Sequence, residues 1–209
     1  MDPQTESPKY VSLVDRPALL IVDMQNDFLT SGGRLYNAGA RDLIPPINAL
    51  AATARAQGVP VVWVIQEHRR QLVDFGREAD ISPFHCVEGT AGAALAAGLE
   101  RQDTDFTVIK RRYSGFYATD LDLLLRCLDR NRVVVTGINS DGCVLATALD
   151  AHARDYRVTV VTDATGAGVA EAQAAALGML GRMQPGVVST VAEVRQQWEA
   201  LSQGMSETV

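Results

Sequence analysis

Three residues that could carry out covalent chemistry lie at or just beyond the ends of apolar segments. Asp23 closes the segment 18–23, Lys110 closes 106–110, and Cys143 follows shortly after 133–138. A thiolate is a nucleophile, a carboxylate can take a proton, and an ammonium group can stabilise negative charge. Each residue alone has a simpler explanation, as a turn cap, a solvated charge or a core thiol. Together they match the pattern of a nucleophile with a base and an orienting group.

The position of Cys143 is the most informative of the three. The segment 133–136 has the β-branched composition of a strand, 137–142 is rich in turn residues, and the residues from Cys143 onward have helical spacing. A thiol at a helix N-terminus faces unpaired backbone N–H groups and the positive end of the helix dipole. The sequence therefore predicts that Cys143 has a lowered pKa and reacts as a thiolate.

The chain alternates apolar strands with amphipathic helices from end to end. Strands are predicted at 18–23, 59–65, 106–110, 133–138, 158–162 and 187–188. Helices are predicted at 42–57, 91–99, 119–128, 143–155 and 169–182, and a last helix begins at a capping box of Thr190 and Glu193. A long polar loop is expected at 67–90. This order predicts a three-layer α/β/α fold around a doubly wound, mostly parallel six-stranded sheet, with the reactive residues at the carboxyl edge of the sheet, where ligands bind.

Composition excludes several classes of function. The net charge of -6 over 209 residues argues against a nucleic-acid-binding protein. No apolar run reaches the roughly 20 residues of a membrane span, and three cysteines without paired spacing fit a reducing cytoplasm. We expect a cytoplasmic protein with one domain at 17–201, a flexible segment at 1–16 and a flexible tail at 202–209.

Three motifs carry a resemblance to a known family: Asp23-Met-Gln-Asn-Asp-Phe28, the strand that ends at Lys110, and Thr136-Gly-Ile-Asn-Ser-Asp-Gly-Cys143-Val. In this order they resemble the isochorismatase-like cysteine hydrolase superfamily. That group includes nicotinamidases, N-carbamoylsarcosine amidohydrolases, and ureidoacrylate and biuret hydrolases. The resemblance implies a homo-oligomer, dimer or tetramer, that acts on a small amide or ureido compound.

The resemblance also implies roles for individual residues. Asp23, Lys110 and Cys143 would be the catalytic triad, with a cis peptide between Ile138 and Asn139 just before the nucleophile loop. The backbone N–H groups of Asn139 and Cys143 would bind the oxyanion of the reaction. Because isochorismate hydrolysis needs no thiol, the retained Cys143 favours hydrolysis of an amide through a thioester, with release of ammonia.

The sequence predicts the metal-binding and substrate-binding residues less specifically than the catalytic triad. The resemblance implies where a metal could bind, because nicotinamidases of this group bind a divalent metal with an Asp-x-His pair and a further histidine. Here His68 and His85 match the two histidines, but Gln66 replaces the acid, and Gln is a weak zinc ligand. We therefore predict no cofactor, with His68 and His85 as the candidates should a metal bind. The residues expected to contact substrate are Phe28, Gln66, His68, Arg69, Tyr113, Phe116 and Asn139.

Three hypotheses follow from the sequence. The first is a cysteine amidohydrolase of a small carboxamide, ureido or N-carbamoyl compound. The second is a metal-assisted nicotinamidase, and the third is a non-catalytic relative that binds a small molecule. Cys86 and Cys127 are expected to be spectators, and His152 to lie too far along its helix to reach Cys143.

Overall fold

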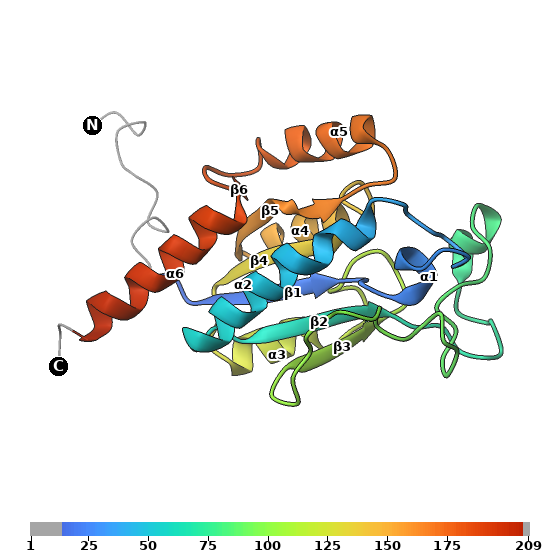
Figure 1. The fold of residues 1–209 in the computed structure, drawn as a ribbon, viewed down its shortest axis with the longest axis horizontal. Coiled ribbons are helices and arrows are strands. Elements are labelled where there is room, and N and C mark those ends of the chain that lie inside the picture. Colours follow the sequence, from blue (N-terminus) through green and yellow to red (C-terminus); the bar gives the residue numbers. More distant parts are fainter. Residues whose placement is uncertain (1–13, 207–209) are drawn as a thin grey trace.

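The structure is a computed structural model that describes residues 14–206, and a six-stranded sheet forms its centre (Figure 1). The strands are β1 (Pro17–Val22), β2 (Val61–Gln66), β3 (Phe106–Lys110), β4 (Arg132–Ile138), β5 (Arg157–Gly166) and β6 (Val188–Ser189). Their order is β3-β2-β1-β4-β5-β6, and every pairing is parallel. The predicted doubly wound α/β sheet is confirmed, and all six strands lie where the apolar runs predict them.

Helices cover both faces of the sheet, because the central strands are apolar on both sides. All six residues of β1 are buried, as expected for a parallel strand between two helical layers. One layer contains α2 (Ile44–Ala56) and α6 (Val191–Ser206), and the other contains α3 (Leu121–Cys127), α4 (Cys143–His152) and α5 (Ala170–Leu180). The capping box before α6 is present, since Glu193 accepts the Thr190 N–H at 2.8 Å and Thr190 accepts the Glu193 N–H at 3.3 Å.

The helix predicted at 91–99 is wrong. This segment is a series of turns, and several of its carbonyl groups accept hydrogen bonds from the region after β1. Asn26 N–H donates to Ala94 O at 2.9 Å, and Asp27 N–H donates to Gly92 O at 3.0 Å. The short helix α1 (Asn26–Leu29) and the 3-10 helices Ala40–Leu43 and Gly76–Asp80 were not predicted.

Of the flexible termini predicted at 1–16 and 202–209, residues 1–13 and 207–209 lie outside the described residues. Of the described part, Arg16 donates to Asp129 at 3.0 Å, and α6 extends as far as Ser206. Within residues 14–206, no helix combines the length and the apolar character that crossing a membrane requires.

The direction of chain growth reverses between β1 and β4. After β1 the chain adds β2 and β3 on one side, and then returns to place β4 on the other side of β1. Such a switch point leaves a crevice beyond the carboxyl ends of the two strands, which is where ligands bind in this class of sheet. Gly137 allows the two strands to meet there, because a Cβ at this position would lie 2.1 Å from the Val22 carbonyl oxygen.

This close approach can be tested with two glycine variants. Gly137→Ala should lower the free energy of unfolding by more than about 1 kcal/mol, because Gly137 has a φ of 100° and no room for a Cβ. Gly178→Ala in α5 is the matched control, since its Cβ would meet nothing within 4 Å, and it should be neutral or stabilising by up to about 1 kcal/mol. Urea denaturation followed by circular dichroism measures both. Equal stability of the two variants would contradict this role of Gly137.

Candidate active site

Asp23, Lys110 and Cys143 meet at the carboxyl edge of the sheet. Lys110 ends β3, Asp23 follows β1 directly, and Cys143 is the first residue of α4. Lys110 Nζ lies 2.8 Å from Asp23 Oδ2 and 3.3 Å from Cys143 Sγ. Lys110 and Asp23 are 0% and 1% exposed, so they form a buried ion pair. The Cys143 thiol lies beside this pair, with 8% of the residue exposed.

The backbone fixes Asp23 in an uncommon conformation. Its φ is 54°, a left-handed value that few residues other than glycine adopt. Its N–H still donates to Val64 O of β2 at 2.9 Å, so the residue is tied to the sheet at the point where the strand ends. Asp23 Oδ2 faces Lys110, whereas Oδ1 has no hydrogen-bond partner among the described residues. That oxygen is available to a proton from the thiol or from a bound substrate.

The predicted thiolate of Cys143 is not supported. Burial and the neighbouring Asp23 carboxylate raise the pKa of the Cys143 thiol well above its ordinary value, although Lys110 acts in the opposite direction. Burial also raises the pKa of Asp23, against the effect of Lys110. Burial alone would lower the pKa of Lys110, but Asp23 and Cys143 outweigh it and raise that pKa. The raised pKa of Cys143 and the 2.8 Å contact between Lys110 and Asp23 describe a neutral thiol beside an ion pair.

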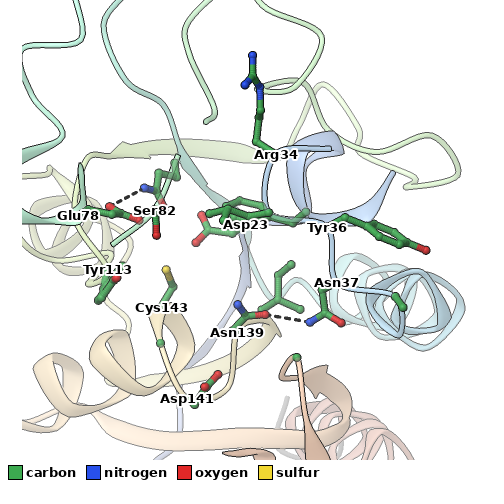
Figure 2. A pocket seen from close by; sticks show the side chains of 17 residues that line it. Asp23, Arg34, Tyr36, Asn37, Glu78, Ser82, Tyr113, Asn139, Asp141 and Cys143 are labelled. Carbon is green, nitrogen blue, oxygen red and sulfur yellow. Dashed lines mark hydrogen bonds between the residues drawn. The ribbon is translucent and has the colours of Figure 1, made fainter. Parts of the chain in front are cut away.

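The loop between β4 and α4 presents backbone N–H groups close to the thiol. The peptide bond between Ile138 and Asn139 is cis, in agreement with the resemblance. Among the described residues, no backbone hydrogen bond uses the N–H groups of Asn139 and Cys143, while Val144 N–H donates to Asn139 O at 3.1 Å. The Asn139 side chain is held by Asn37, whose Nδ2 donates to Asn139 Oδ1 at 3.1 Å (Figure 2).

A cavity of about 700 Å³ opens over this cluster. In Figure 2 the sulfur of Cys143 points into it, with Asp23 and Tyr113 nearby. Four of the predicted substrate contacts line it: Phe28, Gln66, Tyr113 and Asn139. Other polar or charged residues line the cavity that were not predicted from the sequence: Arg34, Tyr36, Asn37, Glu78, Ser82 and Asp141. Asp141 lies within the motif that precedes Cys143, whereas the others come from loops and from a 3-10 helix without a periodic pattern, so no sequence signal placed those at the site.

Three predicted substrate contacts do not line this cavity. Arg69 lies at the surface and pairs with Asp74 at 3.0 Å. His68 is fully buried and stacks on Phe75, with 3.7 Å between ring centroids. Phe116 is 4% exposed and packs in the core cluster that includes residues of α4, so the structure does not place these three residues in the cavity wall.

His68 and His85 do come together, and Glu78 joins them. Their ligand atoms lie within 4.8 Å of one another, which makes this a possible metal-binding group within residues 14–206. Burial lowers the pKa of His68, although Asp74 opposes it. Burial also opposes charge on His85, but hydrogen bonds to Glu78 and to the Pro83 carbonyl outweigh it and raise the pKa of His85.

The donor set does not fit a metal ion as it stands. The Gln66 side-chain nitrogen lies 2.9 Å from His68 Nε2, 3.1 Å from His85 Nε2 and 3.1 Å from Glu78 Oε2. An amide NH₂ group is a donor and cannot ligate a cation, yet it points at the three atoms that would have to do so. No catalytic step is therefore assigned to a metal.

The remaining cysteines and the helical histidine lie apart from the pocket. Cys86 is fully buried, and burial raises its pKa far above the ordinary value, with Asp23 adding to the effect. Cys127 is exposed at the end of α3. His152 is the last residue of α4, whereas Cys143 is the first, so the helix separates them by its full length.

Asp23 and Lys110 shift the pKa of the Cys143 thiol in opposite directions, so substitution of each residue tests this charge arrangement. In the wild type, alkylation by iodoacetamide should have its pH midpoint above the free-thiol value of about 8.5. Asp23→Asn should lower the midpoint by removing a negative charge, and Lys110→Met should raise it by removing the cation. Peptide mass spectrometry at each pH measures the rate at Cys143, and exposed Cys127 serves as the internal reference. A wild-type midpoint well below 8.5, or shifts of one sign in both variants, would contradict this account.

Comparisons with known proteins agree with the fold. The family model described as the isochorismatase domain matches residues 17–193. The chain is 35% identical over 165 residues to the probable inactive nicotinamidase At3g16190 of Arabidopsis thaliana, covering 74% of this chain and 82% of the relative. It is 35% identical over 183 residues to the ureidoacrylate amidohydrolase RutB of Klebsiella pneumoniae, covering 77% and 78%.

A solved structure of a relative also has a similar fold. The N-carbamoylsarcosine amidase from Thermoplasma acidophilum superposes with a TM-score of 0.75 at 32% identity, covering 84% of this chain and 96% of that chain. A family model that spans most of the chain, relatives above 30% identity and a shared six-stranded parallel fold all lead to one assignment. This chain belongs to the isochorismatase-like hydrolase family.

Proposed function

We propose that this chain is a cysteine-dependent amidohydrolase. Its reaction would cleave the C–N bond of a small carboxamide, ureido or N-carbamoyl compound and release ammonia. The observation that carries the proposal is the buried contact of Lys110 Nζ with both Asp23 Oδ2 and Cys143 Sγ, at 2.8 and 3.3 Å, at the base of a cavity. A nucleophile, a base and a cation are thereby placed in contact within one buried group.

The first step is attack by Cys143 on the substrate carbonyl carbon. Because the resting thiol is neutral, its proton must move to Asp23 as the S–C bond forms. Burial raises the pKa of Asp23 and so makes this carboxylate a better proton acceptor. Lys110 stays charged and stabilises the sulfur as its negative charge develops, which is a contribution made mainly in the transition state.

The second step is collapse of the tetrahedral intermediate. The N–H groups of Asn139 and Cys143 would donate to its oxyanion, and such a donor typically contributes about 3–4 kcal/mol. The proton held by Asp23 passes to the leaving nitrogen, the C–N bond breaks, and ammonia departs. A water molecule then gives a proton to Asp23 and attacks the thioester, which restores the thiol and releases the acid.

The substrate class follows from the relatives and from the cavity. Two of the three named relatives are a ureidoacrylate amidohydrolase and an N-carbamoylsarcosine amidase, whose names give a ureido or carbamoyl compound as the substrate. The cavity offers polar groups from several loops, including Asn37, Ser82 and Tyr113, together with the aromatic wall of Phe28. We propose a small ureido or carbamoyl compound ahead of a plain carboxamide. Cytoplasmic location and a homo-oligomeric assembly stay predictions.

Two other functions are alternatives. A metal-assisted nicotinamidase would use His68 and His85, but the Gln66 NH₂ group faces both histidines. A non-catalytic relative is a second alternative, because one similar protein is described as a probable inactive nicotinamidase. The intact group of Asp23, Lys110 and Cys143 favours an active enzyme over this alternative.

Substitution of the nucleophile tests the proposal. Cys143→Ala should lower ammonia release by roughly 10⁴-fold or more, as removal of a covalent nucleophile does in other hydrolases. The fold should be retained, because the change removes one sulfur atom at the start of a helix. A panel of ureido, carbamoyl and carboxamide compounds, assayed for ammonia, identifies the substrate and provides the measurement.

Cys86→Ala and Cys127→Ala are the controls. The first removes a buried thiol that lies outside the cavity lining, and the second removes an exposed one. Both should retain most of the wild-type rate. Turnover by Cys143→Ala above a few per cent of wild type would exclude the covalent mechanism, and a wild-type protein that binds panel compounds without hydrolysing any would favour the non-catalytic alternative.

A further inference from the structure

The side chain of Gln66 occupies the centre of a ring of ligand-type atoms. Its nitrogen is within 3.1 Å of His68 Nε2, His85 Nε2 and Glu78 Oε2. Two members of the ring also contact each other, because His85 Nε2 lies 3.4 Å from Glu78 Oε1. The two histidines are 0% and 1% exposed, and the Glu78 side chain is 8% exposed. The ring is thus removed from bulk water apart from the edge at which Gln66 and Glu78 line the cavity.

The Nδ1 atom of each histidine already has a hydrogen-bond partner. His85 Nδ1 lies 2.8 Å from the Pro83 carbonyl oxygen, which can only accept, so Nδ1 carries a hydrogen. His68 Nδ1 lies 3.3 Å from Asp74 Oδ1. This arrangement turns both Nε2 atoms toward Gln66, and it is the arrangement in which histidines bind metals. The ring therefore has the geometry of a ligand set with an NH₂ group at its centre.

Lys110 determines which end of the amide faces the ring. Lys110 Nζ donates to Gln66 Oε1 at 3.2 Å. A flipped amide would place NH₂ hydrogens against the Lys110 ammonium and an oxygen against the Glu78 carboxylate, and both contacts would be repulsive. The Gln66 backbone cannot adjust, because Gln25 accepts its N–H at 2.9 Å and donates to its carbonyl at 2.7 Å. The ammonium thus directs the amide NH₂ group into the ring.

We propose that the Gln66 amide group takes the place of a divalent metal ion in this chain. Its NH₂ group has two hydrogens, which it shares among His68 Nε2, His85 Nε2 and Glu78 Oε2, and the amide thereby keeps these three atoms together, as a cation would by ligation. Its carbonyl oxygen accepts a hydrogen bond from Lys110. The ring then keeps its arrangement without a metal ion, and the Gln66 side chain is what prevents a metal ion from binding. This inference does not depend on the proposed amidohydrolase activity, because it concerns cation binding.

The geometry also specifies which change would create a metal site. An aspartate at position 66 is one methylene shorter, so its carboxylate would be withdrawn from the centre by about one bond length. The space vacated by the amide nitrogen would then be surrounded by two imidazoles and two carboxylates, a donor set that binds zinc. The present distances of 2.9 to 3.1 Å exceed a zinc–ligand bond of about 2.1 Å, so the ring must contract around the ion.

Zinc binding by three purified proteins tests the proposal. Wild type, Gln66→Asp and Gln66→Asn are stripped with a chelator and then titrated with Zn²⁺ by calorimetry, with elemental analysis after dialysis. Gln66→Asn is the matched control, since it has the size of aspartate without the charge. We expect one Zn²⁺ per chain in Gln66→Asp, with affinity at least about 10-fold above that of the other two proteins. Co²⁺ bound to Gln66→Asp should show the visible absorption of a tetrahedral ion.

The double variant Gln66→Asp/His85→Ala locates the ion and should lose the stoichiometric binding. The proposal is overturned if folded Gln66→Asp binds zinc no better than Gln66→Asn. It is also overturned if the wild-type protein binds one Zn²⁺ per chain and His85→Ala abolishes this binding. Should Gln66→Asp fail to fold by circular dichroism, this second comparison of wild type with His85→Ala decides the question, and absence of stoichiometric zinc in wild type supports the proposal.

Discussion

The buried ion pair of Asp23 and Lys110 is the constraint on which the rest of the site depends. Transfer of either charge alone into the protein interior would cost several kcal/mol, whereas a close and well-bonded pair offsets that cost. Lys110 Nζ has acceptors beyond Asp23, namely Gln66 Oε1 at 3.2 Å, Arg112 O at 3.1 Å and Cys143 Sγ at 3.3 Å. The cation therefore organises the nucleophile, the base and the neighbouring pocket wall together.

The sheet brings these groups together because they stand in a row along its carboxyl edge. Lys110, Gln66 and Asp23 lie at or just beyond the ends of the adjacent strands β3, β2 and β1, and Cys143 follows β4 on the other side of β1. Gln66 and Lys110 are register partners, so the contact between their side chains follows directly from strand pairing. The same residue then connects the cation to the His68–Glu78–His85 ring on its far side.

The parallel sheet and the triad positions could be predicted because both depend on local patterns. Strands buried on two faces read as continuous apolar runs, and the triad residues lie at the ends of such runs. The pKa of Cys143 could not be predicted from its place at a helix start, because burial and the Asp23 charge outweigh the dipole.

Long-range contacts account for the other differences between prediction and structure. The segment 91–99 is shaped by backbone bonds to the region after β1, and Glu78 reaches the ring from a 3-10 helix in the long loop. Arg69 is drawn to Asp74, which also accepts from Arg111. None of these partners is marked by spacing or periodicity, so only the folded chain reveals them.

Interception of the covalent intermediate tests the central claim most directly. With any panel compound that the wild-type protein hydrolyses, acid-quenched samples are digested with trypsin, and the peptide 133–154, whose one cysteine is Cys143, is weighed. Parallel reactions contain hydroxylamine, which converts a thioester into a hydroxamate. The account predicts a mass increase on this peptide equal to the acyl group, or hydroxamate formed in place of the acid. Full-rate ammonia release with neither product would contradict covalent catalysis by Cys143.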